Sequence, residues 1–320
     1  MLQIGYALSS EEHAPNHLVS CARMAEEAGF TFALISDHYH PWINQQGQSS
    51  FVWSVIGGIA HTTTRLHLGT GVTCPTVRIH PAIIAQAAAT AAAMMPGRFF
   101  LGVGTGENLN EHILGDLWPR NVIRRKMLEE AVEIIRLLWQ GGIRSYQGLY
   151  YTVANAQVYT LPDEPPPIIF AASGPRSAKM AGRIGDGIIS TAPDAELLKA
   201  FEATGGAGKP RYGQATVCWA ESEEEARHLA YQWWPNTGLK GGVNWELPLP
   251  AHFEEMAQLV SEDKVAESIV CGPDPEQHIK LIKRFADAGY DHVYVHQVGP
   301  NQEGFFRFYE REVLPKFQQV

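Results

Sequence analysis

Side chains that can do chemistry gather in residues 36–42, which read Ser-Asp-His-Tyr-His-Pro-Trp. They follow the apolar run 32–35, which is typical of a fully buried strand, and Pro41 cannot continue a sheet ladder. In parallel α/β folds, catalytic side chains follow the carboxyl ends of strands. An imidazole such as that of His38 can take and return a proton near neutral pH. The segment therefore favours acid–base chemistry, although an isolated Asp37 would more often be a helix cap.

Glycines dominate a second cluster, residues 102–107, which reads Gly-Val-Gly-Thr-Gly-Glu. Its spacing differs from the GxGxxG of dinucleotide-binding folds, and it follows the fourth expected strand rather than the first, so it does not favour that fold. Glycines instead let a flat ligand approach the backbone closely. Glu107 and Asn110 would then face that ligand, unless Glu107 is only a charge at the start of the next helix.

Small residues form a third cluster at 171–177, where the sequence Ala-Ala-Ser-Gly-Pro-Arg-Ser joins an expected strand to an expected helix. Free N–H groups at a helix N-terminus bind phosphate, and Ser173 adds a hydroxyl. Arg176 or Lys179 could add positive charge. An ordinary Ser cap followed by Pro would look similar, but the position after a strand favours phosphate binding.

His38 and His40 form a His-x-His pair, which ligates a metal ion in some hydrolase barrels. A metal centre needs further ligands from other strand ends. Later strand ends offer hydroxyls such as Ser173, and only His296 could join the pair. We therefore expect no metal centre, which disfavours the alternative of a metal-dependent hydrolase.

Eight apolar segments alternate with helical patterns along the 320 residues, which predicts a parallel α/β sheet. The count favours a closed (β/α)₈ TIM barrel that spans residues 1–320 as one domain, with insertions at about 141–165 and 235–262. The second insertion is flanked by Trp233, Trp234 and Trp245, which we expect to pack in the core or in a lid, with a substrate wall as the alternative. The expected strands are 2–8, 32–36, 66–70, 99–103, 168–171, 188–190, 214–220 and 292–296. The expected helices are 17–28, 50–61, 81–95, 120–139, 173–183, 195–203, 221–234, 253–259, 275–288 and 302–317.

The composition limits the possible functions. A net charge of -9 argues against a general nucleic-acid binder. The four cysteines form no CxxC pair, which disfavours a zinc site or a disulfide framework and fits a reducing cytoplasm. The chain shows neither a signal-peptide pattern nor an apolar run long enough to span a membrane.

Taken together, the sequence resembles the bacterial luciferase-like superfamily, and within it the coenzyme F420-dependent, glucose-6-phosphate-dehydrogenase-like oxidoreductases. The resemblance extends over nearly the whole chain. Several matching sequence blocks in the same order along the chain identify the family more specifically than any single block does. The blocks that carry it are residues 36–42, 80–86, 96–98, 102–110, 178–183 and 185–187.

The resemblance implies a (β/α)₈ barrel that holds a deazaflavin in its C-terminal mouth, with a small-molecule substrate. His38 would be the base that takes the hydroxyl proton as hydride moves to the ring. Trp42 would line the reacting centre, and Glu107 would act as an acid or electrostatic partner. Gly71 and Val72 would form a non-prolyl cis bulge against the ring. The positions implied to bind the cofactor are Asp37, Gly71, Val72, Thr105, Asn110, Ala172, Ser173 and Gly174.

Some segments depart from the sugar-phosphate pattern. The loop after the sixth strand, residues 191–194, has no lysine, so we do not expect glucose 6-phosphate as the substrate. Residues 298–305 resemble a sister group that uses an ordinary flavin. The alternatives are therefore an FMN-dependent monooxygenase or reductase on the same barrel, and a flavin carrier without catalysis. The family also implies a homodimer.

Overall fold

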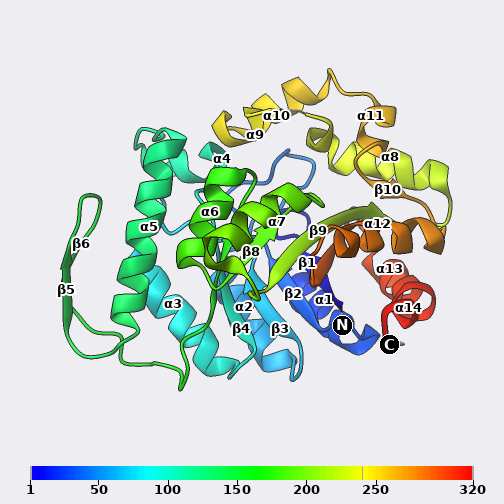
Figure 1. Cartoon of the computed structure of the whole chain (residues 1–320). Helices are drawn as coiled ribbons and strands as arrows, with labels where there is room; N and C mark the ends of the chain where they lie inside the picture. The colour runs from blue at the N-terminus through cyan, green and yellow to red at the C-terminus, as the bar shows by residue number, and fades with distance from the viewer. Residues whose placement is uncertain (1, 240, 319–320) are drawn as a thin grey trace.

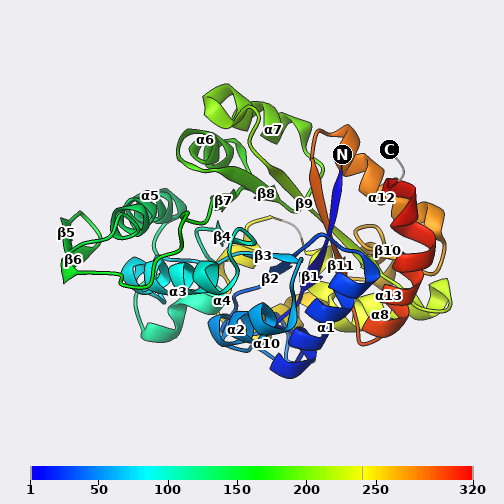
Figure 2. The same ribbon diagram turned by 90° about the horizontal axis from the view of Figure 1, so that it is seen from below.

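Eight parallel strands form a closed barrel in the computed structural model, which describes residues 2–239 and 241–318. The strands pair in the order β1, β2, β3, β4, β7, β8, β9 and β11, and β11 pairs with β1 to close the ring. Figure 1 and Figure 2 show the strands at the centre with helices around them. This confirms the predicted (β/α)₈ barrel. The barrel strands are Gln3–Leu8, Phe32–Ile35, His67–Thr70, Phe99–Val103, Ile168–Ala171, Gly187–Ser190, Arg211–Cys218 and His292–Gln297.

Helices cover the outside of the barrel because each presents an apolar face to the strands. Gly29 ends the first helix in the left-handed region, with φ of 99°, as expected for a glycine cap. The helices are α1 Pro15–Ala28, α2 Val52–Thr62, α3 Pro81–Met94, α4 Asn108–Glu111, α5 Asn121–Leu138, α6 Pro175–Ile184, α7 Ala195–Phe201, α8 Glu223–Trp233, α9 Val243–Glu246, α10 Pro250–Ala257, α11 Glu262–Ala266, α12 Pro275–Asp287, α13 Gln302–Phe308 and α14 Pro315–Gln318.

Two apolar layers make the core. The larger layer lies between the strands and the surrounding helices and includes Leu18, Ile56 and Leu128. The smaller layer fills the barrel itself, where Phe32, Phe100 and Tyr212 pack with aromatic contacts. The filled interior leaves the carboxyl ends of the strands as the place where a ligand can enter.

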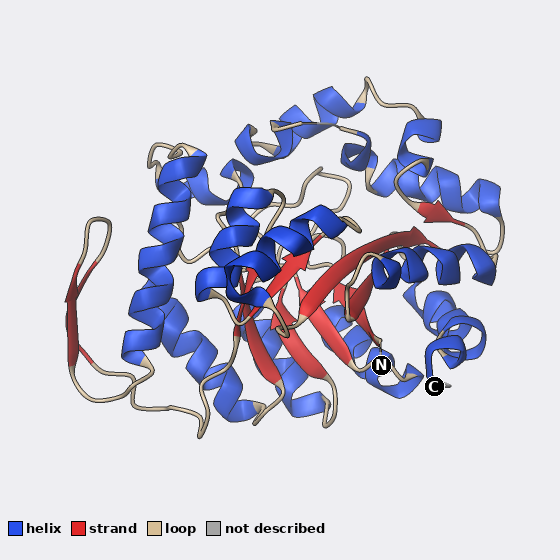
Figure 3. Cartoon of the chain, viewed as in Figure 1, coloured by secondary structure: helices blue, strands red, loops and turns tan. Residues whose placement is uncertain are grey.

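Both predicted insertions differ in detail from the expectation. The first contains an antiparallel hairpin, β5 Arg144–Gln147 and β6 Thr152–Ala156, which stands apart from the barrel in Figure 3. The second contains the helical turns Pro235–Gly238 and α9, which are absent from the helices expected from the sequence. In Figure 1, α9, α10 and α11 lie on the same side of the barrel as α4.

Some element boundaries also shift. Strand β9 begins at Arg211, three positions before the predicted start. The charged side chain of Arg211 is typical of a loop, but it pairs with Glu202 and Asp291. A two-residue strand, β10 Val270–Cys271, adds to the outside of β9. The last predicted helix is interrupted by a π-helical turn at Tyr309–Val313. None of the helices in the described residues is long and apolar enough to cross a membrane.

Candidate active site

A pocket of about 600 Å³ opens at the carboxyl ends of the barrel strands. Every site residue that the sequence predicted lines this one pocket, although the residues come from four separate segments. These segments follow β2, β3, β4 and β7. The predicted residues in the wall are Asp37, His38, Trp42, Gly71, Val72, Thr105, Glu107, Asn110, Ala172, Ser173 and Gly174.

His38 lies between two carboxylates. Its Nε2 atom is 3.6 Å from Oε2 of Glu107, and its Nδ1 atom is 3.4 Å from Oε1 of Glu11. Nδ1 also lies 3.2 Å from the carbonyl oxygen of His40. Both neighbours of Nδ1 only accept hydrogen bonds, which favours the neutral tautomer with its proton on Nδ1. Nε2 lies towards Glu107 and the pocket, so a proton that it takes up would lie between the imidazole and a carboxylate.

Hydrogen bonds hold Glu107 and Glu11 in these places. The Nδ2 group of Asn110 donates to Oε2 of Glu107 at 3.1 Å, and its Oδ1 accepts from the backbone N–H groups of residues 39 and 40. Glu11 is buried, and its Oε2 accepts from the Ser36 hydroxyl at 2.5 Å. Both carboxylates are therefore oriented before any ligand binds.

A buried ionic network lies beside the pocket under Asp37. The Nη2 group of Arg78 donates to Oδ1 of Asp37 at 2.9 Å, and the Thr73 hydroxyl donates to Oδ2 at 2.8 Å. The Arg78 backbone N–H donates to Glu111, whose carboxylate also lies 3.5 Å from Nε of Arg78. Burial raises the pKa of Glu111 to about 7, although Arg78 opposes the shift. Asp37 is thus held in a fixed orientation at the pocket wall.

The peptide bond between Gly71 and Val72 is cis, as the sequence resemblance implied. Glycines around it keep this wall flat. A Cβ atom at Gly102 would lie 1.9 Å from the carbonyl oxygen of Thr70, and one at Gly104 would lie 2.7 Å from Cγ2 of Val72. Both positions therefore require glycine, and the wall leaves room for a planar ring.

The opposite end of the pocket can hold an anion. The N-terminus of α6 has no side-chain cap, and Gly174 faces open space, since a Cβ atom built there has no neighbour within 4 Å. Arg125 and Arg176 line the pocket here, and both continue into a second groove that also contains Lys179. Free N–H groups and two guanidinium groups suit a phosphate or carboxylate tail. The residues present therefore fit a flavin-like cofactor with an anionic side chain.

Aromatic and amide side chains form the remaining wall. Trp42 packs on the His38 ring, with 5.2 Å between ring centroids, and Phe253 packs on the other side of Trp42. Asn244 and Trp245 of α9 also line the pocket, so Trp245 is part of a wall rather than of the barrel core. Within the described residues that line the pocket, Arg125 and Arg176 are the only lysine or arginine side chains.

His38 and His40 do not share a site. The His40 ring turns to the carbonyl oxygen of Leu109, at 2.8 Å from Nδ1, and stacks on His112. His296 instead lies 3.1 Å from the Glu12 carboxylate. In the described part of the chain, no three His, Cys, Asp or Glu side chains are grouped as metal ligands would be.

Three residues in and beside the pocket were not predicted from the sequence as parts of the site. Glu11 lies in the loop after β1, where Glu-Glu-His reads as an ordinary polar loop. The guanidinium of Arg78 pairs with Asp37 and Glu111 beside the pocket. Arg125 lies in the first turns of α5, on a polar helix surface. Of the three, only the Glu-Glu-His run directly after a strand gave a usable signal.

Comparison with known proteins agrees with this geometry. The chain matches the luciferase-like monooxygenase family over residues 2–292. An F420-dependent glucose-6-phosphate dehydrogenase of Microbacterium testaceum is 36% identical, with 99% of this chain and 98% of the relative covered. An F420-dependent hydroxymycolic acid dehydrogenase of Mycobacterium tuberculosis is 37% identical, with 98% and 88% covered.

Solved structures give the same picture. An F420-dependent secondary alcohol dehydrogenase in complex with an F420-acetone adduct has a TM-score of 0.91 at 29% identity, with 98% of both chains covered. The F420-dependent tetrahydromethanopterin reductase from Methanopyrus kandleri has a TM-score of 0.79 at 22% identity, with 99% of both chains covered. The second similarity concerns the fold alone.

Proposed function

This chain belongs to the luciferase-like monooxygenase family, and we propose that it is an oxidoreductase that moves a hydride between coenzyme F420 and a small alcohol or carbonyl compound. The observation that carries this proposal is the position of His38, with Nε2 at the pocket and both ring nitrogens beside carboxylates. The relatives named as F420-dependent dehydrogenases support the cofactor. The cofactor supplies a ring that accepts or donates a hydride.

His38 is the proposed general base. Removing a hydride from an alcohol leaves a carbonyl only if the hydroxyl proton is also removed. Nε2 of His38 has the free lone pair that this step needs, because Nδ1 is bound to acceptors. After protonation, the imidazolium would lie between Glu11 and Glu107, and the two negative charges would stabilise it.

Glu107 and Trp42 complete the proposed catalytic group. Glu107 is the electrostatic partner of His38 on the substrate side, and Asn110 fixes its carboxylate by a hydrogen bond. Trp42 packs on the imidazole and limits its rotation, so that Nε2 stays directed at the reacting hydroxyl. Orientation of this kind lowers the entropic part of the barrier.

The cofactor would be held at three places. Asp37 would contact the ring side, where hydrogen bonds from Arg78 and Thr73 keep its carboxyl group oriented. Gly71 and Val72 would support the ring face. The proposed contacts of the side chain and its anionic groups are Thr105, Asn110, Ala172, Ser173 and Gly174, with Arg125 and Arg176 as the nearby cations.

The proposed substrate is uncharged. The two pocket cations lie beside the α6 N-terminus, at the end assigned to the cofactor. Around Trp42 and Glu107, the described lining residues offer no lysine or arginine for a sugar phosphate. A secondary alcohol or ketone needs only the base and an apolar wall, both of which this end provides.

Fluorescence titration of the purified protein with F420, and separately with FMN, tests the cofactor. We expect F420 to bind far more tightly. The loaded enzyme is then assayed with propan-2-ol and with glucose 6-phosphate by following loss of F420 fluorescence. Turnover of the alcohol supports the proposal, whereas tighter binding of FMN or turnover of glucose 6-phosphate alone would contradict it.

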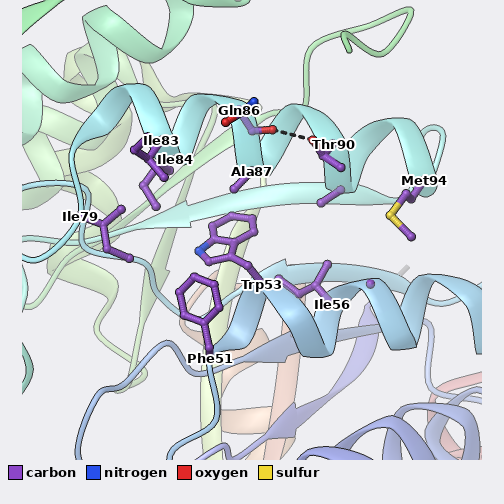
Figure 4. A pocket seen from close by; sticks show the side chains of 12 residues that line it. Phe51, Trp53, Ile56, Ile79, Ile83, Ile84, Gln86, Ala87, Thr90 and Met94 are labelled. Atoms are coloured by element: carbon purple, nitrogen blue, oxygen red, sulfur yellow. Dashed lines mark hydrogen bonds between the residues drawn. The ribbon is translucent and has the colours of Figure 1, made fainter. Parts of the chain in front are cut away.

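We also propose that the protein is a homodimer. An apolar groove of about 300 Å³ runs between α2 and α3, and Figure 4 shows Phe51, Trp53 and Ile83 around it. Phe51, Ile83 and Met94 are exposed although they are large and apolar. Contiguous exposed apolar surface is typical of a protein–protein contact, and a second copy of this chain is the proposed partner.

Light scattering coupled to size-exclusion chromatography tests the dimer. Ile83→Lys should give the mass of one chain, because a lysine in the groove would need to be desolvated. Leu117→Lys changes another exposed apolar residue, outside the groove, and should leave the mass unchanged. A monomeric wild-type protein would contradict the proposal.

The proposed location is the cytoplasm. The thiols of Cys21, Cys74, Cys218 and Cys271 are all free, as is usual in a reducing compartment. Fractionation of cells that produce the protein tests this assignment. Recovery in the membrane or secreted fraction would contradict it.

A further inference from the structure

The short helix α9 forms part of the pocket wall without belonging to the barrel. Its residues Asn244 and Trp245 line the pocket, and it packs against α4, as Figure 1 also shows. A helix of one turn is not stable by itself. Its position over the pocket must therefore come from its contacts with the rest of the protein.

Two contacts fasten the end of α9, and both involve Glu246. The backbone carbonyl of Glu246 accepts a hydrogen bond from Nδ2 of Asn108 at 2.9 Å. Its carboxylate lies 3.7 Å from Nη1 of Arg124, which belongs to α5. The residue directly after Trp245 is thus attached both to α4 and to α5.

Arg124 is an unusual partner because its side chain is only 1% exposed. Its guanidinium lies 4.1 Å from the centre of the Trp118 ring, and Nη1 donates to the carbonyl of Pro119 at 2.7 Å. Its Nε group is buried without a hydrogen-bond partner. A buried guanidinium without an anion is costly, and within the described residues Glu246 is the carboxylate paired with it.

The insertion is held to the catalytic loop at a second place. Leu239, Leu247 and Phe253 pack with Trp42 and its neighbour Ile43. In addition, the Glu254 carboxylate accepts two hydrogen bonds from Asn44, at 2.8 and 3.0 Å. Loss of the Glu246 ion pair would therefore loosen α9 while the rest of the insertion stays attached.

We propose that Arg124 is a positioning residue whose pair with Glu246 holds Asn244 and Trp245 in the substrate wall and so restricts the enzyme to short substrates. This inference rests on the proposed function and names the elements that set its substrate range. A fixed α9 contacts a short alcohol closely and blocks a long one. A loosened α9 loses its contact with the short alcohol and leaves room for the long alcohol.

The variants Glu246→Gln and Arg124→Lys test the pair. Glu246 is 61% exposed, so Glu246→Gln should fold normally, and Arg124→Lys keeps the positive charge and should act more mildly. The matched control is Glu223→Gln, which removes a carboxylate from an exposed pair with Arg227 on α8. The kinetic probes are propan-2-ol and octan-2-ol, with F420 affinity measured by fluorescence.

For Glu246→Gln we expect KM for propan-2-ol to rise about tenfold with little change in kcat, because the lost contact serves binding rather than the chemical step. The ratio of kcat/KM for octan-2-ol over propan-2-ol should rise by a similar factor. The F420 affinity should not change. Glu223→Gln should match the wild type in every measurement. An unchanged ratio in Glu246→Gln would overturn the inference.

Hydrogen–deuterium exchange separates this inference from the proposed function, since it needs no turnover. Amides of residues 241–247 should exchange faster in Glu246→Gln than in Glu223→Gln. Faster exchange in a protein that turns over no alcohol would support the role of Arg124 in holding α9 and contradict the proposed reaction. Equal exchange in both variants would overturn the role of Arg124 itself.

Discussion

The Oε1 atom of Glu11 lies 3.4 Å from Nδ1 of His38, while Nε2 of the same ring lies 3.6 Å from Glu107. This arrangement gives each ring nitrogen its own carboxylate. The Glu11 side keeps the proton on Nδ1, which leaves Nε2 free to act as a base. A positive charge that forms on the ring is then stabilised from both sides.

The first prediction concerns His38. His38→Ala should lower kcat by roughly 10²–10⁴-fold, the usual contribution of a positioned general base. The F420 affinity should stay close to that of the wild type, since the ring contacts attributed to Asp37 and the glycines remain. Steady-state kinetics and fluorescence titration check both parts. Full turnover in His38→Ala would exclude this residue as the base.

The second prediction concerns Glu11. Glu11→Gln keeps the shape of the side chain but removes the charge that stabilises the imidazolium. The loss of a charged partner beside the imidazolium should cost about 1 kcal/mol, so kcat should fall by about fivefold. Steady-state kinetics check this result. An unchanged kcat would mean that Glu11 only supports the fold.

The barrel was predictable because its strands are short apolar runs that alternate with helical patterns. The exceptions have physical causes. Arg211 begins β9 but forms ion pairs outside the barrel, so its side chain suggests a loop. The strand Val270–Cys271 has two residues, too few for any periodicity. The turn of α9 depends on contacts with distant residues rather than on its own sequence.

The pocket was predictable where polar residues directly follow an apolar run, as at Asp37, His38 and Glu107. Pairing between distant loops was not predictable. Glu11 reaches His38 only because β1 and β2 are neighbours in the barrel. The fold likewise buries Arg78 between Asp37 and Glu111, which are both distant from it in the sequence. The amino-acid sequence alone does not show which distant loops lie in contact.

The third prediction concerns Arg78. Arg78→Met would leave Asp37 and Glu111 buried without their cation, which should lower the free energy of unfolding by roughly 3–5 kcal/mol. The control is Arg23→Met, which breaks an exposed pair with Glu27. The change Arg23→Met should lower the free energy of unfolding by less than about 1 kcal/mol. Urea denaturation of both variants measures the difference, and equal losses would show that the buried network adds no stability.

The fourth prediction concerns pH and Glu111. Burial raises the pKa of Glu111 from 4.5 to about 7, so the folded protein holds this proton more tightly than the unfolded chain. The stabilisation is complete below about pH 4.5 and is lost as pH rises through about 7. The glutamine in Glu111→Gln has no proton to lose. As the pH rises through this range, the free energy of unfolding of the variant should therefore increase by roughly 2–3 kcal/mol relative to that of the wild type. Urea unfolding at pH 5, 6, 7 and 8 tests this, and a constant difference would contradict it.

The fifth prediction concerns the anionic end of the pocket. Arg125→Gln and Arg176→Gln should each weaken F420 binding by roughly tenfold, because each removes a charged contact to the cofactor tail. Added salt should weaken the wild type more than either variant, since screening acts on the lost interaction. Arg65→Gln removes an exposed charge away from the pocket and serves as the control. If all three variants bound F420 like the wild type at every salt concentration, the tail would have to lie elsewhere, and the assignment of Ser173 and Gly174 would fail with it.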